Sequence, residues 1–298
     1  MTTRERRRLI QNIILVAPQL FLYVLLTLAP LVVAVPVLFT DRKTYTDVDV
    51  EYIGFENFAR IFKDEAIAEE YWPAFRRTAQ FTFFNYLMVF VFGLTLALLM
   101  YEVGFRGGMF TMIYAPQMLS GLALGFIAIM MFGEATGTVN LILRELGWAR
   151  DPISIRTEAG TTVMLPILVG WRSAGFNMAI FLSGLLSIPK ENIEAAIVDG
   201  ASYLQRLWYI YFPQMVPSFT MATIFCLLGS FQVFDILVPL GGLAANRNAE
   251  FLSIVFQRYG FQVERLALGL TLVVETLVPL TLISLLLVRL QRRFSYTR

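Results

Sequence analysis

The sequence contains no histidine and only one cysteine among its 298 residues. Without histidine, the chain lacks the most common metal ligand and the most common general base. A single thiol also excludes an internal disulfide framework. Because Cys226 lies inside an apolar run, we interpret it as a small buried hydrophobe. We therefore expect neither a metal site nor catalytic residues in this chain.

Charge is scarce as well. Charged residues make up 15% of the chain and hydrophobic residues 57%, whereas soluble domains contain roughly 25% charged residues. The formal net charge of +2 gives no global basic field that would attract nucleic acid. This composition is typical of a membrane protein, and the length allows a single domain.

Long uncharged runs dominate the sequence. A helix needs about 20 apolar residues to cross the hydrocarbon core, and the runs are continuous rather than alternating as in a barrel strand. The sequence therefore predicts an all-α membrane protein with one transmembrane domain over residues 1–298 and about six transmembrane helices. The six expected spans are 13–39, 78–101, 108–132, 161–186, 213–240 and 266–288.

The first of these runs follows a basic N-terminus but is not a signal peptide by length. No charge occurs from Ile13 to Thr40, and this is longer than the roughly 7–15 residues of a signal-peptide core. Both chain ends are basic, Arg106 lies in the short second connection, and the loop 41–77 carries nine acidic against six basic residues. The positive-inside rule thus places both termini in the cytoplasm.

The connection Ser187–Phe212 reads as a short helix at the membrane surface. Pro189 suits a first helical turn, and Ser187 is a candidate cap. Residues Lys190–Val198 favour a helix, and Gly200 can end it with a positive φ.

The same helix has an apolar face and small side chains. Ile193, Ala196 and Ile197 lie at i, i+3, i+4 spacing and share one face, while Ala195 and Ala201 permit close approach by another protein. By physical chemistry alone, the helix either only shapes the loop or forms a docking site for a partner.

The residues of this connection resemble a known motif. Glu194-Ala195-Ala196, Asp199-Gly200-Ala201, Ile210 and Phe212-Pro213 are similar to the EAA loop of ABC importer permeases. The family pattern has Glu-Ala-Ala, three residues, Gly, nine residues, Ile, one residue and Leu-Pro. Phe212 stands where leucine is usual, which is a conservative departure.

The resemblance covers nearly the whole chain and points to the carbohydrate-uptake (maltose-type) group, in particular to its F-like permease subunit. After the fifth span this group often has Thr-Gly-Gly-Gly-Pro, whereas this chain departs from it with Gly241-Gly242-Leu243-Ala244-Ala245. The further matching elements are Gly54–Phe58, Gly137–Gly147, Trp171–Pro189 and Phe231–Asp235.

The resemblance implies a type I ABC importer permease with a cytoplasmic coupling helix, in the bacterial inner membrane as a multi-pass protein. It implies a heterodimer with a second permease subunit, two copies of an ABC ATPase, an extracytoplasmic substrate-binding protein and lipid contact, but no nucleic acid. The chain has no phosphate-binding loop motif, so ATP and Mg are expected only at the ATPase and no cofactor in this chain. The implied ATPase-coupling residues are Glu194, Ala195, Ala196, Asp199 and Gly200.

Three charged residues lie within the predicted spans: Arg172, Glu275 and, near one end of the fifth span, Asp235. A charge at the bilayer centre costs about 2.5–3.5 kcal/mol on insertion scales, so each needs a partner or water. Arg172 lies 11 residues into its span and Glu275 nine into its own. Both spans run inward, so we expect the two side chains to approach each other.

Several residues are candidates for a substrate path. Sugar sites combine an aromatic face with a few polar groups. Phe231, Gln232 and Asp235 have i, i+1, i+4 spacing, which lets Phe231 and Asp235 share a helix face. Ordinary packing competes with this role at each aromatic. The other candidates for the path are Trp171, Arg172, Asn177, Glu275 and Asn85.

The sequence leaves other functions open. The cargo could be glycerol phosphate, a polyamine or a peptide, and the sequence names no sugar. A secondary transporter is disfavoured by the lack of histidine relays and the few buried acids, and a membrane scaffold without transport is the remaining alternative. The partner permease and the subunit that holds the main substrate site are not determined by the sequence.

Overall fold

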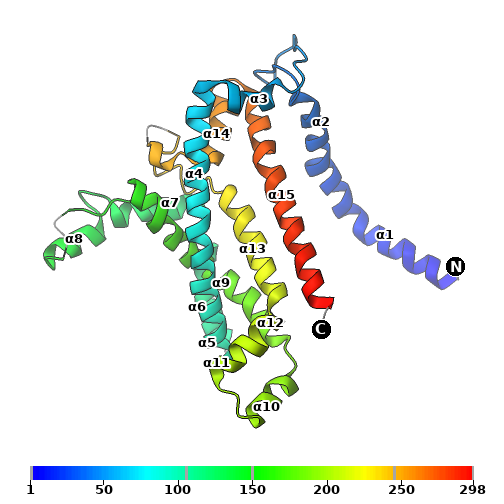
Figure 1. Ribbon diagram of the computed structural model, residues 1–298. Coiled ribbons are helices and arrows are strands. Elements are labelled where there is room, and N and C mark those ends of the chain that lie inside the picture. The colour runs from blue at the N-terminus through cyan, green and yellow to red at the C-terminus, as the bar shows by residue number, and fades with distance from the viewer. Residues whose placement is uncertain (1–2, 105–106, 149–150, 244–245, 297–298) are drawn as a thin grey trace. The chain divides into compact units, whose positions relative to one another are not determined.

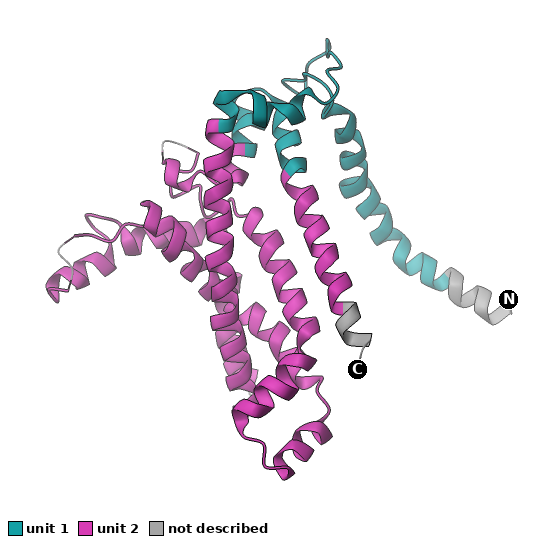
Figure 2. Cartoon of the chain, viewed as in Figure 1, with its two compact units in different colours: residues 1–68, 256–275 teal, residues 69–255, 276–298 magenta. Residues whose placement is uncertain are grey.

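The computed structural model describes residues 3–104, 107–148, 151–243 and 246–296, and helices dominate these residues (Figure 1). Within these ranges no strand forms, and Thr40 and Tyr52 make only an isolated bridge. Arg106, Ala244, Ala245 and Arg298 lie outside the described residues. The chain divides into two compact units (Figure 2). Unit 1 comprises Met1–Ala68 and Phe256–Glu275, and unit 2 comprises Glu69–Val255 and Thr276–Arg298.

Several helices are long and apolar enough to cross a membrane. Among the described residues four are continuous, and two further pairs are sharply bent, so the chain has up to six spans. This confirms the prediction of an all-α protein with about six spans. The four continuous helices are Gln11–Val37, Glu65–Val103, Gly160–Leu186 and Leu266–Gln291; the bent pairs are Gly107–Met118 with Gly121–Phe132 and Tyr203–Gln214 with Val216–Phe231.

Most of these helices contain a π-helical turn. The α-helices are α1 (Thr3–Tyr23), α2 (Ala29–Val37), α3 (Glu56–Lys63), α4 (Glu65–Met88), α5 (Thr95–Val103), α6 (Gly107–Tyr114), α7 (Gly121–Phe132), α8 (Thr138–Glu145), α9 (Leu165–Leu186), α10 (Lys190–Val198), α11 (Tyr203–Arg206), α12 (Phe212–Gln214), α13 (Val216–Phe231), α14 (Leu252–Gln257) and α15 (Leu266–Tyr296). The π-helical turns are Val24–Leu28, Val89–Leu94, Gly160–Met164, Leu207–Tyr211 and Arg258–Gln262, and the 3-10 turns are Ala115–Met118 and Arg247–Ala249.

The third predicted span is broken rather than straight. A 3-10 turn over Ala115–Met118, which contains Pro116, ends its first half. Ser120 then caps α7, because its hydroxyl accepts a hydrogen bond from the Ala123 N–H at 3.1 Å. The two halves meet at an angle of 88°.

The fifth predicted span is bent and shorter than expected. The bend of 67° lies at Met215, just before Pro217, which removes a backbone donor. The helix ends at Phe231 and not at Leu240, and the chain continues in turns, in which the Leu237 N–H donates to the Phe234 carbonyl at 2.9 Å. Such irregular backbone is tolerated at membrane depth where protein buries it.

Two hydrophobic clusters hold unit 2 together. One joins the π turn after α4, α9, the α10 region and α13, and the other joins α4, α7, α9 and the turns after α13. The first cluster contains Val89, Phe181, Leu185, Ile193, Leu207, Tyr211 and Met215. The second contains Phe81, Leu124, Leu165, Ile236, Leu237, Leu240 and Phe251.

In unit 1 the end of α2 is tied to α3 and to the start of α15. The Asn57 amide, buried at 1% exposure, donates to the Leu38 carbonyl at 3.0 Å and to the Thr40 carbonyl at 2.8 Å. The Leu266 N–H donates to the carbonyl of Lys43 at 3.0 Å. These bonds explain the asparagine in the Gly54–Phe58 element: it fixes the loop that follows α2.

Candidate functional site

Helix α10 covers Lys190–Val198, as the sequence predicts. Its N-cap position is Pro189, and no side chain caps it. Ser187 does not cap this helix, contrary to expectation. It stands at the C-terminal end of α9, where its hydroxyl donates to the Gly184 carbonyl at 2.7 Å. Ser187 is the C-cap residue of α9, so it does not occupy the position directly before α10, which is Pro189.

The C-terminal end of α10 is closed by Gly200, which has the positive φ of +77° that the sequence predicts. The Gly200 N–H donates to the Ile197 carbonyl at 3.0 Å, and the Ala201 N–H donates to the Ala196 carbonyl at 2.9 Å. This is the Schellman arrangement, in which a left-handed residue satisfies the last carbonyls of a helix. Asp199 holds the C-cap position.

Gly200 provides a test of this helix end. No atom lies within 4 Å of the position that a Cβ would occupy, so Gly200→Ala adds backbone strain and no clash. We expect a loss of about 1–2 kcal/mol in stability, measured as a lower thermal unfolding midpoint of the purified chain. Gly107→Ala is the control, because it is equally unobstructed and has no positive φ. Equal midpoints for the two variants would contradict the role of Gly200.

The predicted apolar face of α10 is only partly buried. Ile193 is 9% exposed and joins the first cluster, whereas Ile197 is 53% and Val198 86% exposed. Glu194 and Ala195 are exposed as well. The helix therefore packs on the bundle through Ile193, and the residues that the structure describes leave its mixed acidic and apolar face uncovered.

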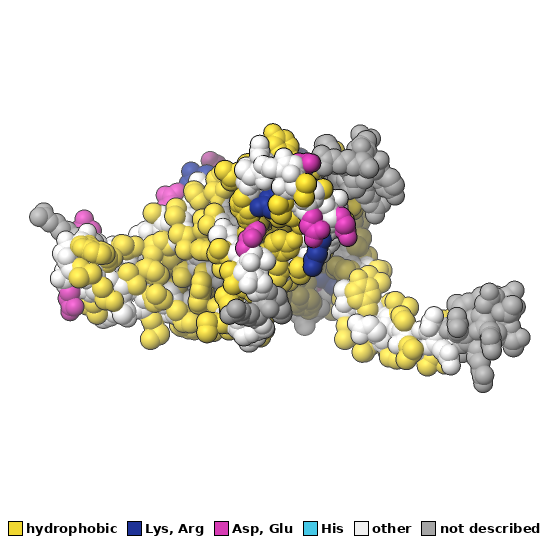
Figure 3. All heavy atoms as spheres, turned by 90° about the horizontal axis from the view of Figure 1, so that it is seen from below, with side chains coloured by type: hydrophobic (Ala, Val, Ile, Leu, Met, Phe, Trp, Pro, Cys, Tyr) yellow, Lys and Arg dark blue, Asp and Glu magenta, His cyan; other side chains and the backbone are white. Residues whose placement is uncertain are grey.

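The segment after α10 is fixed to the bundle. Ser202 and Gln205 form a capping box at α11: the Ser202 N–H donates to the Gln205 side-chain oxygen at 2.7 Å. Leu207 and Tyr211 then anchor the following π turn in the first cluster. Viewed from this end of unit 2, charged side chains gather near α10, and the helices around it present mainly hydrophobic side chains (Figure 3).

A cavity of about 290 Å³, lined by both polar and apolar residues, lies where α7 begins and α13 ends. It brings together Arg172, Gln232 and Asp235, three of the predicted path residues, although they come from α9 and from the turn after α13. Gln232 and Asp235 are exposed and Arg172 is half-buried. A guanidinium, an amide and a carboxylate can together hold hydroxyl groups by donating and accepting hydrogen bonds.

Arg172 has unused hydrogen-bonding capacity. Its Nη1 donates to the Leu119 carbonyl at 3.4 Å, and its Nε is buried without a partner among the described residues. Glu275, its predicted partner, lies in α15 within unit 1. Their pairing stays a prediction.

Within unit 2, the remaining predicted path residues do not line this cavity. Asn177 is buried and donates to the Ser173 carbonyl at 3.0 Å within α9. Asn85 is buried and donates to the Ser230 hydroxyl at 3.1 Å, so it joins α4 to α13. Trp171 is 45% exposed.

Phe231 and Asp235 do not share a helix face, because α13 ends at Phe231. The spacing argument that linked them is therefore wrong. Pro239 and Gly241-Gly242 lie at least eight residues beyond this end, so they do not account for it.

Sequence reasoning missed two glycines that shape the cavity. A Cβ on Gly121 would lie 2.8 Å from the Asp235 Cβ, and a Cβ on Gly125 would lie 2.7 Å from the Ile236 carbonyl oxygen. Both glycines face the same way on α7 and let the turn after α13 approach its backbone. Their G-x-x-x-G spacing, a known contact pattern of membrane helices, was the available signal.

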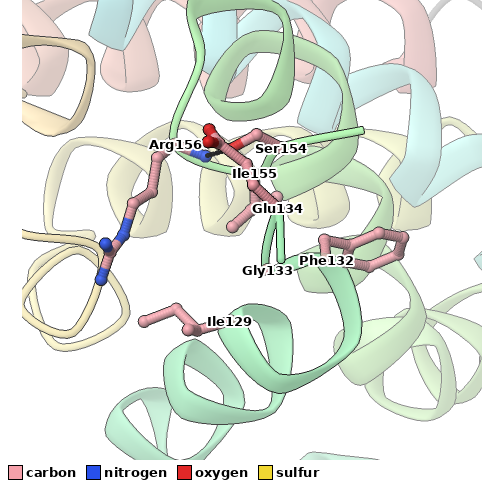
Figure 4. A pocket seen from close by; sticks show the side chains of 7 residues that line it. All are labelled: Ile129, Phe132, Gly133, Glu134, Ser154, Ile155 and Arg156. Atoms are coloured by element: carbon pink, nitrogen blue, oxygen red, sulfur yellow. Dashed lines mark hydrogen bonds between the residues drawn. The ribbon is translucent and has the colours of Figure 1, made fainter. Parts of the chain in front are cut away.

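A second cavity, of about 170 Å³, lies between the end of α7 and the loop before α9. Figure 4 shows Ile129 and Phe132 of α7 on one side, with Glu134, Ser154 and Arg156 from the loops.

Asn140 of α8 holds the loops of this second cavity together. Its amide nitrogen donates to the Gly133 carbonyl at 2.9 Å and to the Ile153 carbonyl at 2.8 Å, and its oxygen accepts from the Ile153 N–H at 2.8 Å. The asparagine of the Gly137–Gly147 element therefore has a structural role: it joins the segment at Gly133 to the segment at Ile153.

Several helices long and apolar enough to cross a membrane, with a short exposed helix between two of them and a cavity at two helix breaks, are features of a polytopic membrane protein. Residues 89–296 match the family of binding-protein-dependent transport system inner membrane components, and the chain belongs to this family. It is therefore a permease subunit of an inner-membrane transport system.

The chain is 28% identical to the probable starch degradation products transport system permease protein AmyD of Thermoanaerobacterium thermosulfurigenes, over 93% of this chain and 92% of that protein. It is 28% identical to the sn-glycerol-3-phosphate transport system permease protein UgpA of Agrobacterium fabrum, over 91% and 90%. Its fold matches the crystal structure of a bacterial alginate ABC transporter in complex with alginate pentasaccharide-bound periplasmic protein, with a TM-score of 0.79 and 22% identity over 97% of this chain and 96% of that one. This confirms the predicted ABC importer permease fold.

Proposed function

We propose that the chain is one of two permease subunits of an ATP-driven importer for a sugar or oligosaccharide. A second permease completes the path, two copies of a separate ATPase bind and hydrolyse ATP with Mg, and an external binding protein delivers the cargo. Both termini of the chain lie in the cytoplasm. The similarity to AmyD supports a carbohydrate cargo.

The observation that carries this proposal is the geometry of α10. The helix is closed at its end by Gly200 and anchored by Ile193, and short connections join it to α9 and to the α11 region. A force applied to its exposed face is transmitted to these helices, because Ile193 anchors the segment 187–212 to the bundle and the capping box of Ser202 and Gln205 fixes the start of α11. Glu194, Ala195 and Ala196, with Asp199 at the C-cap, form the ATPase contact in this proposal, and the cavity at Arg172 and Asp235 forms part of the path.

Site-specific cross-linking tests the ATPase contact. Val198→Cys, on the exposed face of α10, is expected to cross-link to the ATPase in the assembled complex. Leu146→Cys, 54% exposed at the end of α8, is the control and should not. The native Cys226 is buried and does not interfere. Cross-linking of Leu146→Cys but not Val198→Cys would overturn the assignment.

Glycerol phosphate is the second candidate cargo, and two observations favour it. UgpA, whose name states glycerol-3-phosphate transport, is as similar in identity as AmyD. Arg172 also supplies a guanidinium with an unpartnered Nε, which suits an anion. Uptake of labelled starch-derived oligosaccharides and of sn-glycerol-3-phosphate by vesicles with the complete importer distinguishes the two. Uptake of glycerol phosphate alone would reject the carbohydrate assignment.

A further inference from the structure

Unit 1 contains a cationic cavity that the proposed transport path does not use. Its volume is about 240 Å³. The fold brings four basic residues to it from three separate segments: the loop after α2, helix α3 and the start of α15. The residues that line it are Asp41, Arg42, Lys43, Asn57, Arg60, Arg265, Ala267 and Leu268.

The backbone of this cavity is held in place before any ligand arrives. The Ala267 N–H donates to the carbonyl of Arg42 at 3.0 Å. The Lys43 N–H donates to the Asp47 carboxylate at 2.7 Å, which closes the loop on itself. Glu264, directly before Arg265, has a φ of +52°. This conformation is unfavourable for a non-glycine residue, and such strain is often found at ligand clamps.

The positive charge of the cavity is only partly neutralised. Glu56 pairs with Arg60 at 3.1 Å, and the Asp47 carboxylate interacts electrostatically with Arg42. Asp41, which lines the cavity, accepts a hydrogen bond from the Glu51 N–H at 2.8 Å. Arg42 donates from Nη2 to the Asp47 carbonyl at 3.4 Å, but its Nε is buried without a partner among the residues that the structure describes. A buried donor without an acceptor is costly, and an oxyanion with several oxygens would satisfy it.

The cavity lies at the level where membrane headgroups are expected. Helix α2 ends at Val37 and α15 begins at Leu266, and both are the ends of candidate spans. Exposed aromatic rings border the same loops: Tyr45 and Phe261 lie with their centroids 6.3 Å apart, and Phe55 is 72% exposed. Aromatic side chains are enriched at both membrane interfaces.

From this position and charge we propose that the cavity binds the phosphate group of an anionic phospholipid. Arg42 and Arg265 would hold the phosphate oxygens, Lys43 and Arg60 would add positive charge, and the aromatic rings would lie among the adjoining headgroups. The lipid would stabilise the junction of α2, α3 and α15. This inference does not depend on the cargo or on the ATPase contact.

Native mass spectrometry of the full-length chain, purified with phosphatidylglycerol or with phosphatidylcholine, tests the proposal. The wild-type chain is expected to retain phosphatidylglycerol preferentially. Arg42→Gln with Arg265→Gln should weaken that retention roughly ten-fold or more, since each basic residue near a membrane surface contributes to anion attraction. Arg144→Gln with Arg247→Gln, exposed positions in unit 2, is the matched control and should retain the lipid.

Two further measurements keep the test decisive. Arg42→Lys keeps the charge but loses the guanidinium, and partial retention is expected if the chain folds, as judged by an unchanged elution volume. Equal retention by the wild-type chain and the double variant would overturn the proposal. If inorganic phosphate alone raises the unfolding midpoint of the lipid-free chain as much as phosphatidylglycerol does, the ligand is free phosphate and the lipid assignment is wrong.

Discussion

Replacing Glu194 by lysine is expected to lower ATP-driven transport at least ten-fold while the chain still folds and pairs with its partner permease. Glu194 and Ala195 are exposed on α10, whereas the preceding residue, Ile193, is buried against the bundle. A charge reversal there costs the bundle little, since surface substitutions usually change stability by less than about 0.5 kcal/mol. Like charges opposed at an interface cost several kcal/mol, and about 1.4 kcal/mol already corresponds to ten-fold.

The measurement is cargo uptake by vesicles, together with copurification of the ATPase. Glu102→Lys is the matched control, because Glu102 is an exposed acid at the end of α5 and does not belong to α10. It should leave both readouts near wild type. Normal transport by Glu194→Lys in a normally assembled complex would reject α10 as the coupling element.

Gly121→Ala is expected to have the second large effect, a substantial loss of transport with reduced stability. The added methyl would lie 2.8 Å from the Asp235 Cβ and 3.4 Å from the Ile236 backbone nitrogen. One of the two segments must move, and overpacking of this kind typically costs about 1–3 kcal/mol. Because Asp235 lines the cavity, its displacement changes the cavity as well as the packing.

Gly108→Ala is the control for this experiment. It lies in the same broken span, and no atom lies within 4 Å of its Cβ position. We expect wild-type transport from Gly108→Ala, and a lower unfolding midpoint together with altered cargo affinity from Gly121→Ala. A Gly121→Ala chain with unchanged midpoint and unchanged affinity would show that the close approach of α7 to Asp235 is not needed.

The spans were predictable because a membrane helix is specified by composition over a long window. The breaks within the spans were not, since they depend on local hydrogen bonds that composition does not report. Ser120 illustrates this: only its bond to the Ala123 N–H identifies it as the cap that starts α7 after the 88° bend. A serine inside an apolar run gives no comparable signal in the sequence.

The candidate site was predictable to different degrees in its two parts. Helix α10 follows from local rules, and its bounds and the positive φ of Gly200 agree with the prediction. The cavity depends on segments that are distant in the sequence. Arg172 and Asp235 were predicted separately as residues of the path, but their meeting at one cavity depends on the early end of α13 and on the glycines of α7.

The turn that follows α13 has a consequence for how such a protein changes over evolution. Gln232 and Asp235 face the cavity from a segment without a continuous helical hydrogen-bond ladder, while Ile236 and Leu237 fix that segment to the core. Substitution of Gln232 or Asp235 therefore changes the polar groups that face the cavity, and no helical hydrogen bond among the described residues depends on either side chain. In the proposed transport path, cargo preference can therefore diversify at these two positions while the surrounding scaffold is inherited unchanged.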